Sequence, residues 1–291
     1  MQSGFDGEKM KNIILSVNFN KPEALLSIEN VIDWAKLNNV KVYMIESERD
    51  IRGVIHISEK EIDELDKNET FIIAFGGDGT MLHTAKTAYR HDLRLAGVNL
   101  GSLGFLSEIR HTGLKKHLDM MKNGEFVIEM RIMADARYKQ NRLTGLNDIL
   151  VLSKETKRMV KIGVFLNNRE VMTISADGII ISTPTGSTAY SMAAGGPIVM
   201  ADVPCFLLTP ICPHILVQKP MVLSQESKIK LIPVNNNALL TADSQVSIEV
   251  EKGGEIIVEK CPSYLKLVKF KDIDFFDIMR EKFFLGRDPR K

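Results

Sequence analysis

The N-terminal third of the chain alternates short apolar runs with amphipathic runs, and this alternation constrains the fold more than any other feature of the sequence. The apolar runs have the length of buried strands, and the runs between them repeat apolar residues at three- and four-residue steps, as one face of a helix does. We predict strands at 12–17, 40–45, 70–75 and 93–99, with helices beginning at Pro22, Ser58 and Met81. This order predicts a parallel sheet covered by helices, with ligands bound beyond the carboxyl ends of the strands.

From about Phe126 the pattern changes to one strand-like run after another, with short polar gaps and few helical stretches. A hairpin is predicted at 164–174 around Asn167-Asn168, because asparagine tolerates the left-handed backbone of tight turns. The predicted fold class is an α/β N-terminal domain with a parallel sheet, residues 1–125, followed by a C-terminal all-β, β-sandwich-like domain, residues 126–270.

The composition is that of an ordinary globular protein and excludes several classes of function. Of 291 residues, 44% are hydrophobic and 26% are charged, which argues against a disordered, collagenous or coiled-coil chain. The 38 Lys and Arg residues balance 37 Asp and Glu residues, so a net charge of +1 supplies no general attraction to nucleic acid or to an anionic membrane. We expect neither as a partner, and a phosphate site must be built locally.

The three cysteines, Cys205, Cys212 and Cys261, form no CxxC pair and no cluster with histidine in the sequence. This pattern argues against a disulfide framework and a structural zinc site, and it indicates a reducing compartment. The longest apolar stretch, 205–217, is interrupted by proline and histidine and is shorter than the ~20 residues that span a bilayer. We therefore expect a cytoplasmic protein without a membrane helix.

The strongest local motif is the predicted strand at 71–75 followed by Gly76-Gly77-Asp78-Gly79-Thr80 and a predicted helix. Glycines let the backbone approach a phosphate, and the N–H groups at the start of a helix face the anion. The spacing matches neither a P-loop nor the dinucleotide fingerprint. A carboxylate in such a turn is expected to accept a proton or to bind a metal. The alternative is that Asp78 only caps the helix.

Two further loops have the composition of ligand-binding segments. Residues 98–106 carry a strand end into a glycine-containing loop, for which an ordinary strand-to-helix turn is the alternative. Residues 177–190 carry an apolar strand into a segment rich in serine and threonine, with proline and glycine. Small hydroxyl groups suit a polyhydroxylated ligand, and the alternative is a polar surface loop.

Taken together, these segments resemble those of the NAD kinases over nearly the whole chain. The motifs that carry the resemblance are Gly-Gly-Asp-Gly-Thr at 76–80, Asn-Leu-Gly-Ser-Leu-Gly-Phe-Leu at 99–106, Leu-Asn-Asp at 146–148 and the serine- and threonine-rich segment at 177–191. Diacylglycerol kinases, sphingosine kinases and phosphofructokinases carry related glycine turns, so the last motif is the specific one.

The resemblance implies transfer of a phosphoryl group from ATP, or polyphosphate in some members, to the adenosine ribose 2′-hydroxyl of NAD, which gives NADP. It assigns Asp78 as the general base and a glycine turn as the phosphate-binding element. The implied phosphate contacts are Gly76, Gly77, Gly79 and Thr80. The implied substrate contacts are Gly79, Phe105, Asn147, Asp148, Asp177, Thr188, Ala189 and Tyr190. A divalent cation, normally magnesium, is expected to be bound through the nucleotide phosphates and water, without metal ligands from the protein.

The family resemblance also implies a homodimer or homotetramer and a C-terminal tail, residues 271–291, that rejoins the first domain. Two positions depart from the family pattern. Asp243-Ser244-Gln245 stands where Asp-Gly-Gln is common, which leaves the role of Asp243 open, and Lys219 stands where arginine is common. Lysine keeps the charge but not the bidentate grip of arginine. The alternatives are a lipid kinase of the diacylglycerol type and a nucleotide-binding regulator without turnover. The sequence leaves the donor and the choice between NAD and NADH open.

Overall fold

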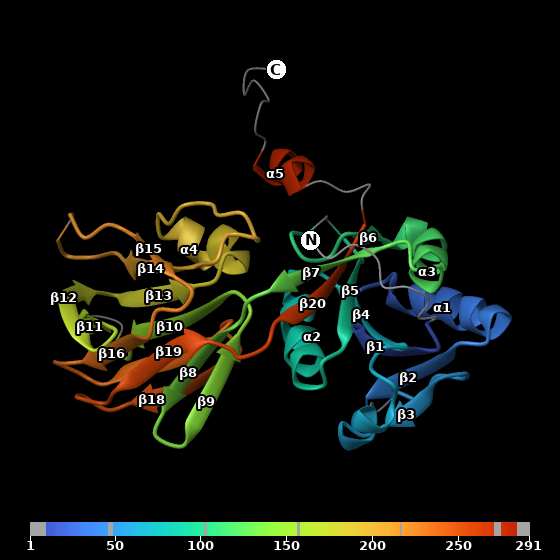
Figure 1. Ribbon diagram of the computed structural model, residues 1–291, viewed down its shortest axis with the longest axis horizontal. Helices are drawn as coiled ribbons and strands as arrows, with labels where there is room; N and C mark the ends of the chain where they lie inside the picture. Colours follow the sequence, from blue (N-terminus) through green and yellow to red (C-terminus); the bar gives the residue numbers. More distant parts are fainter. Residues whose placement is uncertain are drawn as a thin grey trace. The chain divides into compact units, whose positions relative to one another are not determined.

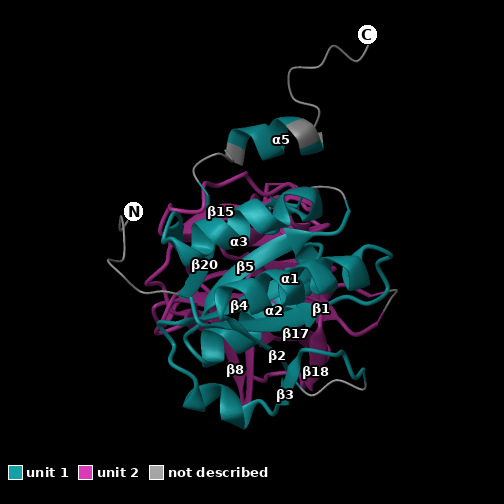
Figure 2. Cartoon of the chain, turned by 90° about the vertical axis from the view of Figure 1, so that its right-hand side faces the viewer, with its two compact units in different colours: residues 1–130, 265–291 teal, residues 131–264 magenta. Residues whose placement is uncertain are grey.

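The computed structural model describes residues 10–45, 49–101, 104–155, 158–215, 217–270 and 275–283. The chain forms two compact units, coloured separately in Figure 2: unit 1 is Met1–Met130 with Leu265–Lys291, and unit 2 is Arg131–Tyr264. Ser102 and Leu103 of the second motif, and residues 271–274 and 284–291 of the predicted tail, lie outside the described residues. Among the positions that are described, no helix is long and apolar enough to cross a membrane.

Unit 1 contains a mostly parallel sheet in the strand order β3-β2-β1-β4-β5-β20-β7, with β6 paired to β5 (Figure 1). Its central strands β1, β4 and β5 are parallel neighbours, so their carboxyl ends meet at one edge of the sheet. The strands are β1 Asn12–Val17, β2 Lys41–Ile45, β3 Ile55–Ile57, β4 Thr70–Gly76, β5 Arg94–Asn99, β6 Ile109–Arg110, β7 Val127–Arg131 and β20 Leu265–Lys269.

Helices cover both faces of this sheet (Figure 1). One face packs its core side chains against α1 and α3, and the buried α1 residues Ile28, Ile32 and Ala35 recur at the predicted helical spacing. On the other face, Met81 of α2 lies so close to β5 that a Cβ at Gly97 would lie 2.6 Å from its sulfur. The helical segments of unit 1 are α1 Ala24–Asn38, η1 Lys60–Glu64, α2 Asp78–Arg90, η2 His111–Gly113, α3 Leu114–Lys122 and α5 Phe275–Phe283.

Unit 2 consists of two antiparallel sheets of six strands each among the described residues. Their orders are β15-β14-β13-β10-β17-β18 and β12-β11-β16-β19-β8-β9. The strands are β8 Ala134–Tyr138, β9 Asn141–Gly145, β10 Asp148–Ser153, β11 Val160–Leu166, β12 Arg169–Ala176, β13 Gly178–Ser182, β14 Cys205–Ile211, β15 Met221–Ser224, β16 Ile229–Pro233, β17 Ala238–Ala242, β18 Val246–Val250 and β19 Ile256–Lys260. Two short helices, η3 Thr185–Thr188 and α4 Tyr190–Ala193, follow β13.

One hydrophobic core gathers side chains from both of these sheets, such as Val151 and Ile181 from one and Ile162 and Val258 from the other. This arrangement is a β-sandwich. The predicted fold class, an α/β domain with a parallel sheet followed by an all-β domain, is therefore confirmed. The predicted hairpin is also confirmed, because Asn167 and Asn168 both have left-handed backbone angles, with φ of 51° and 67°, between β11 and β12.

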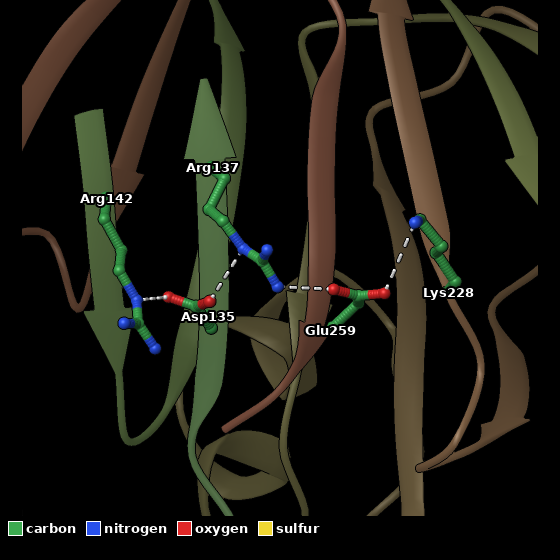
Figure 3. Close-up of polar contacts among 5 residues, drawn as sticks. All are labelled: Asp135, Arg137, Arg142, Lys228 and Glu259. Atoms are coloured by element: carbon green, nitrogen blue, oxygen red, sulfur yellow. Dashed lines mark hydrogen bonds and ion pairs between the residues drawn. The ribbon is translucent and has the colours of Figure 1, made fainter. Parts of the chain in front are cut away.

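A series of ion pairs links neighbouring strands of the second sheet, as Figure 3 shows. The carboxylate of Asp135, whose side chain is 2% exposed, accepts hydrogen bonds from Nε of Arg137 at 3.1 Å and Nε of Arg142 at 2.6 Å. Arg137 also donates to Glu259, which lies 3.7 Å from Nζ of Lys228. A buried carboxylate is tolerated here because two guanidinium groups compensate its charge.

Two local predictions differ from the structure. The helix expected at 58–65 is a single 3₁₀ segment, although Glu61 accepts hydrogen bonds from both N–H and Oγ of Ser58, as the capping pattern predicts. The second domain is predicted to extend to residue 270, but Leu265–Lys269 is a strand that pairs in parallel with β5 of unit 1. Strand periodicity shows that a segment is extended and does not show which sheet it joins.

Candidate functional site

Asp78 lies at the start of α2, where the buried strand β4 turns into the helix. Gly77 is the N-terminal cap residue, and no side chain of the described residues makes a capping hydrogen bond. Instead, the two carboxylate oxygens of Asp78 accept the backbone N–H groups of Phe105 and Leu106, each at 3.1 Å. The capping alternative is therefore wrong, and the carboxylate is oriented by the second glycine loop of the sequence.

Close approach between the two loops depends on glycine. A Cβ at Gly104 would overlap Oδ1 of Asp78 and would lie 2.8 Å from Oγ of Ser107. A Cβ at Gly76 would overlap the side chain of Thr80, whereas Gly77 and Gly79 face open space. Two of the glycines in these motifs therefore allow tight packing, and two leave room for a ligand beside the helix start.

A hollow of about 520 Å³ lies beside the same turn. Its lining residues come from the end of β1, the loop after it and the first turn of α2: Ser16, Val17, Asn18, Lys21, Gly77, Gly79, Thr80 and His83. Lys21 is exposed and its ammonium group makes no ion pair within the described part of the chain. No motif in the sequence points to Lys21. Its position four residues after a parallel strand, at the carboxyl edge of the sheet, is the signal that could have found it.

In unit 2, Asn147 and Asp148 form the turn that enters β10. Asp148 is 4% exposed, yet its carboxyl group accepts no hydrogen bond from the described residues. Burial, and secondly the negative charge of Asp243, raise the pKa of Asp148 to about 7. The side-chain amide of Asn147 is half-buried and also has no hydrogen-bond partner among those residues. The side chains of Asn147 and Asp148 therefore have hydrogen-bonding groups that are available to a ligand.

The serine- and threonine-rich segment uses most of its hydroxyl groups inside the protein. Ser182 and Thr183 donate to the carbonyls of Asn147 and Leu146 at 3.2 and 2.5 Å. Ser187 bonds to the backbone of Val199. Further along, Ser191 bonds to Thr209. The composition of this loop suits a polyhydroxylated ligand, but the hydroxyl groups of its buried part bond within the protein.

Further along this segment the side chains are more open. Thr188 and Ala189 are partly exposed, and Tyr190 is 42% exposed at the start of α4. The backbone before them is packed on the Asn147 turn, because a Cβ at Gly186 would overlap the carbonyl of Asn147. The structure therefore brings the segment 185–190 next to the Asn147 turn within unit 2.

Asp177 is not brought to this cluster within the chain. It precedes β13, and the register pairs Gly178 with Leu152 but Ser182 with Asp148. Asp177 and the Asp148 turn therefore lie at opposite ends of the strand, about 16 Å apart at ~3.3 Å per residue. Asp177 is exposed, as is Lys219, the residue that departs from the family pattern.

Comparison with protein families and known sequences gives a consistent result. Residues 13–126 match the family model of the ATP-NAD kinase N-terminal domain, and residues 146–270 match that of the ATP-NAD kinase C-terminal domain. The NAD kinase of Thermoanaerobacter sp. (strain X514) is 35% identical over 280 residues, which cover 94% of this chain and 99% of that protein. The NAD kinase of Heliobacterium modesticaldum is 35% identical over 285 residues, covering 96% and 100%.

Two solved structures are similar over most of the chain. An NAD kinase from Archaeoglobus fulgidus in complex with ATP has a TM-score of 0.71 and 28% sequence identity, covering 94% of this chain and 97% of that one. Yeast NADH kinase complexed with NADH has a TM-score of 0.85 and 22% identity, covering 96% and 89%, and this likeness bears on the fold alone.

Proposed function

The chain belongs to the NAD kinase family, and from this premise we propose how its residues divide the phosphorylation of NAD between the two units. Unit 1 carries out the phosphoryl transfer and unit 2 holds NAD. The observation that carries the proposal is the carboxylate of Asp78, oriented by two backbone N–H groups beside a glycine-lined hollow with an unpaired lysine among the described residues.

In this proposal Asp78 is the general base. Phosphoryl transfer requires in-line positioning, charge neutralisation and a group that orients the attacking hydroxyl. Each carboxylate oxygen of Asp78 accepts one N–H and keeps a second lone pair, which can take the proton of the 2′-hydroxyl. Phe105 supplies one of these N–H groups, and its side chain is a further proposed contact with the substrate.

The hollow beside Gly77 and Gly79 takes the phosphoryl donor. The free N–H groups at the start of α2 suit phosphate oxygens, Thr80 lies in the same turn, and the ammonium group of Lys21 offsets their charge. ATP is the proposed donor, since the Archaeoglobus relative was solved in complex with ATP. Polyphosphate offers the same phosphate chemistry and is tested as the second donor.

A divalent cation, normally magnesium, is proposed to arrive with the donor. Within the described residues no group of three or more His, Cys, Asp or Glu could hold a metal ion. A cation bound by phosphate oxygens and water needs no such group, and it neutralises charge on the transferred phosphoryl. The chain's own contribution is then to hold the phosphates and orient the nucleophile.

The NAD site is proposed to include Asn147 and Asp148, whose polar side chains have no protein partner in the described structure. Because burial raises the pKa of Asp148 to about 7, its protonated form is populated at neutral pH and can donate as well as accept a hydrogen bond with a ribose hydroxyl. Thr188, Ala189 and the exposed ring of Tyr190 are the proposed contacts with the adenosine half. Asp177 remains a predicted substrate contact at a separate place on unit 2.

The test is a coupled assay for NADP with the purified full chain, magnesium and either ATP or polyphosphate, run with NAD and NADH in parallel. We expect NADP from NAD and ATP, loss of turnover without magnesium, and no phosphorylation of diacylglycerol. Calorimetry extends the test, since adenosine should bind and nicotinamide mononucleotide should bind far more weakly, by up to ~10⁴-fold. Equal affinity for adenosine and nicotinamide mononucleotide would show that NAD binds at a different site. Light scattering tests the proposed homodimer or homotetramer.

A further inference from the structure

The turn at 146–148 is held from both sides by the rest of unit 2. Its carbonyl groups accept hydrogen bonds from the segment after β13, including Thr183 N–H to the carbonyl of Asn147 at 2.9 Å. Its three N–H groups point the other way, toward Asp243. The carboxylate of Asp243 accepts from Leu146 at 3.0 Å, Asn147 at 2.8 Å and Asp148 at 3.3 Å.

Asp243 is itself fixed in place. It is 7% exposed, its own N–H donates to the carbonyl of Asp148 at 3.0 Å, and its backbone is left-handed with φ of 51°. Ser244 follows with φ of 55°, and together they form the tight turn between β17 and β18. The pairing of β17 with β10 sets this turn beside Asn147, across 96 residues of sequence.

We propose that Asp243 is a positioning residue for NAD, which acts by holding the backbone of the Asn147–Asp148 turn so that both side chains face the ligand. Resting on the proposed NAD site, this assigns a role to Asp243, which directly precedes the position where the sequence departs from the family pattern. The departure lies at Ser244, which tolerates the left-handed turn, while the carboxylate itself is retained.

Packing around the turn supports a fixed geometry. A Cβ at Gly145 would lie 2.5 Å from the carbonyl of Asp148 and 3.2 Å from Oδ1 of Asp243, so a side chain at this position would have to displace the turn. Because the backbone groups are satisfied on both sides, the side chains of Asn147 and Asp148 make no hydrogen bonds that hold the turn within the described part of the chain. They remain available to a substrate.

The test compares Asp243→Asn with Ser244→Gly, which changes the same turn but keeps the carboxylate. Asparagine has one acceptor oxygen in place of two and turns an N–H donor toward backbone donors. We expect the KM for NAD to rise about 10- to 100-fold, the range for stranding one or two buried N–H groups, with kcat and the KM for ATP changed less than about threefold. Ser244→Gly is expected to leave all three constants unchanged.

A second readout separates positioning from general support of the fold. The negative charge of Asp243 disfavours ionisation of Asp148, so its removal is expected to shift the pH midpoint of NAD binding to lower pH. Asp243, in the turn after β17, is the charged group that disfavours ionisation of Asp148, and the charged residue bonded to η3 is Arg131, whose Nη1 donates to Oγ1 of Thr185 at 3.1 Å. An unmoved midpoint would overturn the proposal.

If the Asp243→Asn variant does not fold, two other measurements still test the positioning role of Asp243. Gly145→Ala pushes the turn away from an intact Asp243 and is expected to raise the KM for NAD without changing that for ATP. In the unaltered protein, hydrogen exchange of the Asn147 amide is expected to be slowed at least about 100-fold, since that amide is bonded to a buried carboxylate. Free exchange, or equal effects on NAD and ATP, would contradict the role of Asp243. Normal behaviour of Asp243→Asn alongside weak NAD binding in Asn147→Ala would reject Asp243 while keeping the NAD site.

Discussion

The turn that carries Asp78 and the turn that carries Asp148 place a carboxyl group in opposite environments. Asp78 is partly exposed at the start of a helix, and both of its oxygens accept backbone N–H groups from a neighbouring loop. Asp148 is buried, receives no hydrogen bond from the described residues and lies near a second carboxylate, Asp243. In the second turn, the N–H donors are bonded to Asp243 instead.

The two environments determine what each carboxyl group can do. Two backbone N–H donors fix the orientation of the Asp78 carboxylate, and a carboxylate held in place can take a proton from a hydroxyl group. Burial beside a negative charge favours the protonated form, which binds a polyhydroxylated ligand without introducing a charge. An aspartate is therefore suited to proton transfer at position 78 and to ligand binding at position 148.

The largest effect is expected at the first turn. Asp78→Asn keeps the size of the side chain and one acceptor oxygen but removes the base, so kcat should fall about 10²- to 10⁴-fold. Steady-state kinetics at saturating NAD and ATP measure this loss. Turnover near that of the unaltered enzyme would remove the distinction between the two carboxyl groups.

At the second turn, the ionisation of Asp148 is expected to make the free energy of unfolding depend on pH. The raised pKa means that protonated Asp148 stabilises the fold at low pH, and this stability is lost as pH rises from about 4 toward 7. Asp148→Asn removes the titration. Its stability relative to the unaltered protein should therefore increase by about 3 kcal/mol between pH 5 and pH 8, at roughly 1.4 kcal/mol per pKa unit. Urea unfolding without NAD measures this difference, and a pH-independent difference would mean that Asp148 is not held protonated.

A smaller effect on turnover is expected from the glycine that brings the two loops of unit 1 together. Gly104→Ala forces its loop away from Oδ1 of Asp78, and a displacement of this kind should lower kcat about 10- to 100-fold. Gly101→Ala is the matched control, because a Cβ there would meet its nearest atoms at ordinary distances of 3.9 and 4.0 Å. Equal kinetics in the two variants would show that the position of the Asp78 carboxylate is not critical.

The smallest effect is expected at the hollow. Lys21→Met should raise the KM for ATP about tenfold, equivalent to ~1.4 kcal/mol for a lost, partly exposed contact between lysine and phosphate, with little change in the KM for NAD. Lys21→Arg keeps the positive charge and should recover most of the loss. An unchanged KM for ATP in Lys21→Met would place the donor outside this hollow.

The sequence predicted the first turn better than the second because the first is local. A strand, a glycine-rich turn and a helix follow one another within 21 residues, from Thr70 to Arg90, and the periodicity of the strand and the helix is visible. The contact between Asp243 and Asn147 depends on the pairing of β10 with β17, which no local pattern encodes. The hydrogen bonds of the Ser182 and Thr183 hydroxyls to the 146–147 backbone could not be predicted for the same reason, since these acceptors lie more than 30 residues away in the sequence.

The assignment of strands to sheets was limited in the same way. Leu265–Lys269 alternates like its predecessors in unit 2, yet it pairs with β5 of unit 1. Lys21 was missed because a single lysine in a loop carries no pattern. Lys21 becomes a candidate only in the folded structure, because the parallel pairing of β1 and β4 places the loop after β1 beside the Asp78 turn.

The most direct test of the division of work is titration calorimetry of NAD into two variants, Asp78→Asn and Asn147→Ala. The account predicts that Asp78→Asn binds NAD within about threefold of the unaltered enzyme, because its carboxylate acts on the hydroxyl group rather than holding the substrate. Asn147→Ala should lose about 1 to 3 kcal/mol of binding free energy, because a polar group of the ligand is left without its partner. Unchanged affinity in Asn147→Ala, or an equal loss in both variants, would contradict the account.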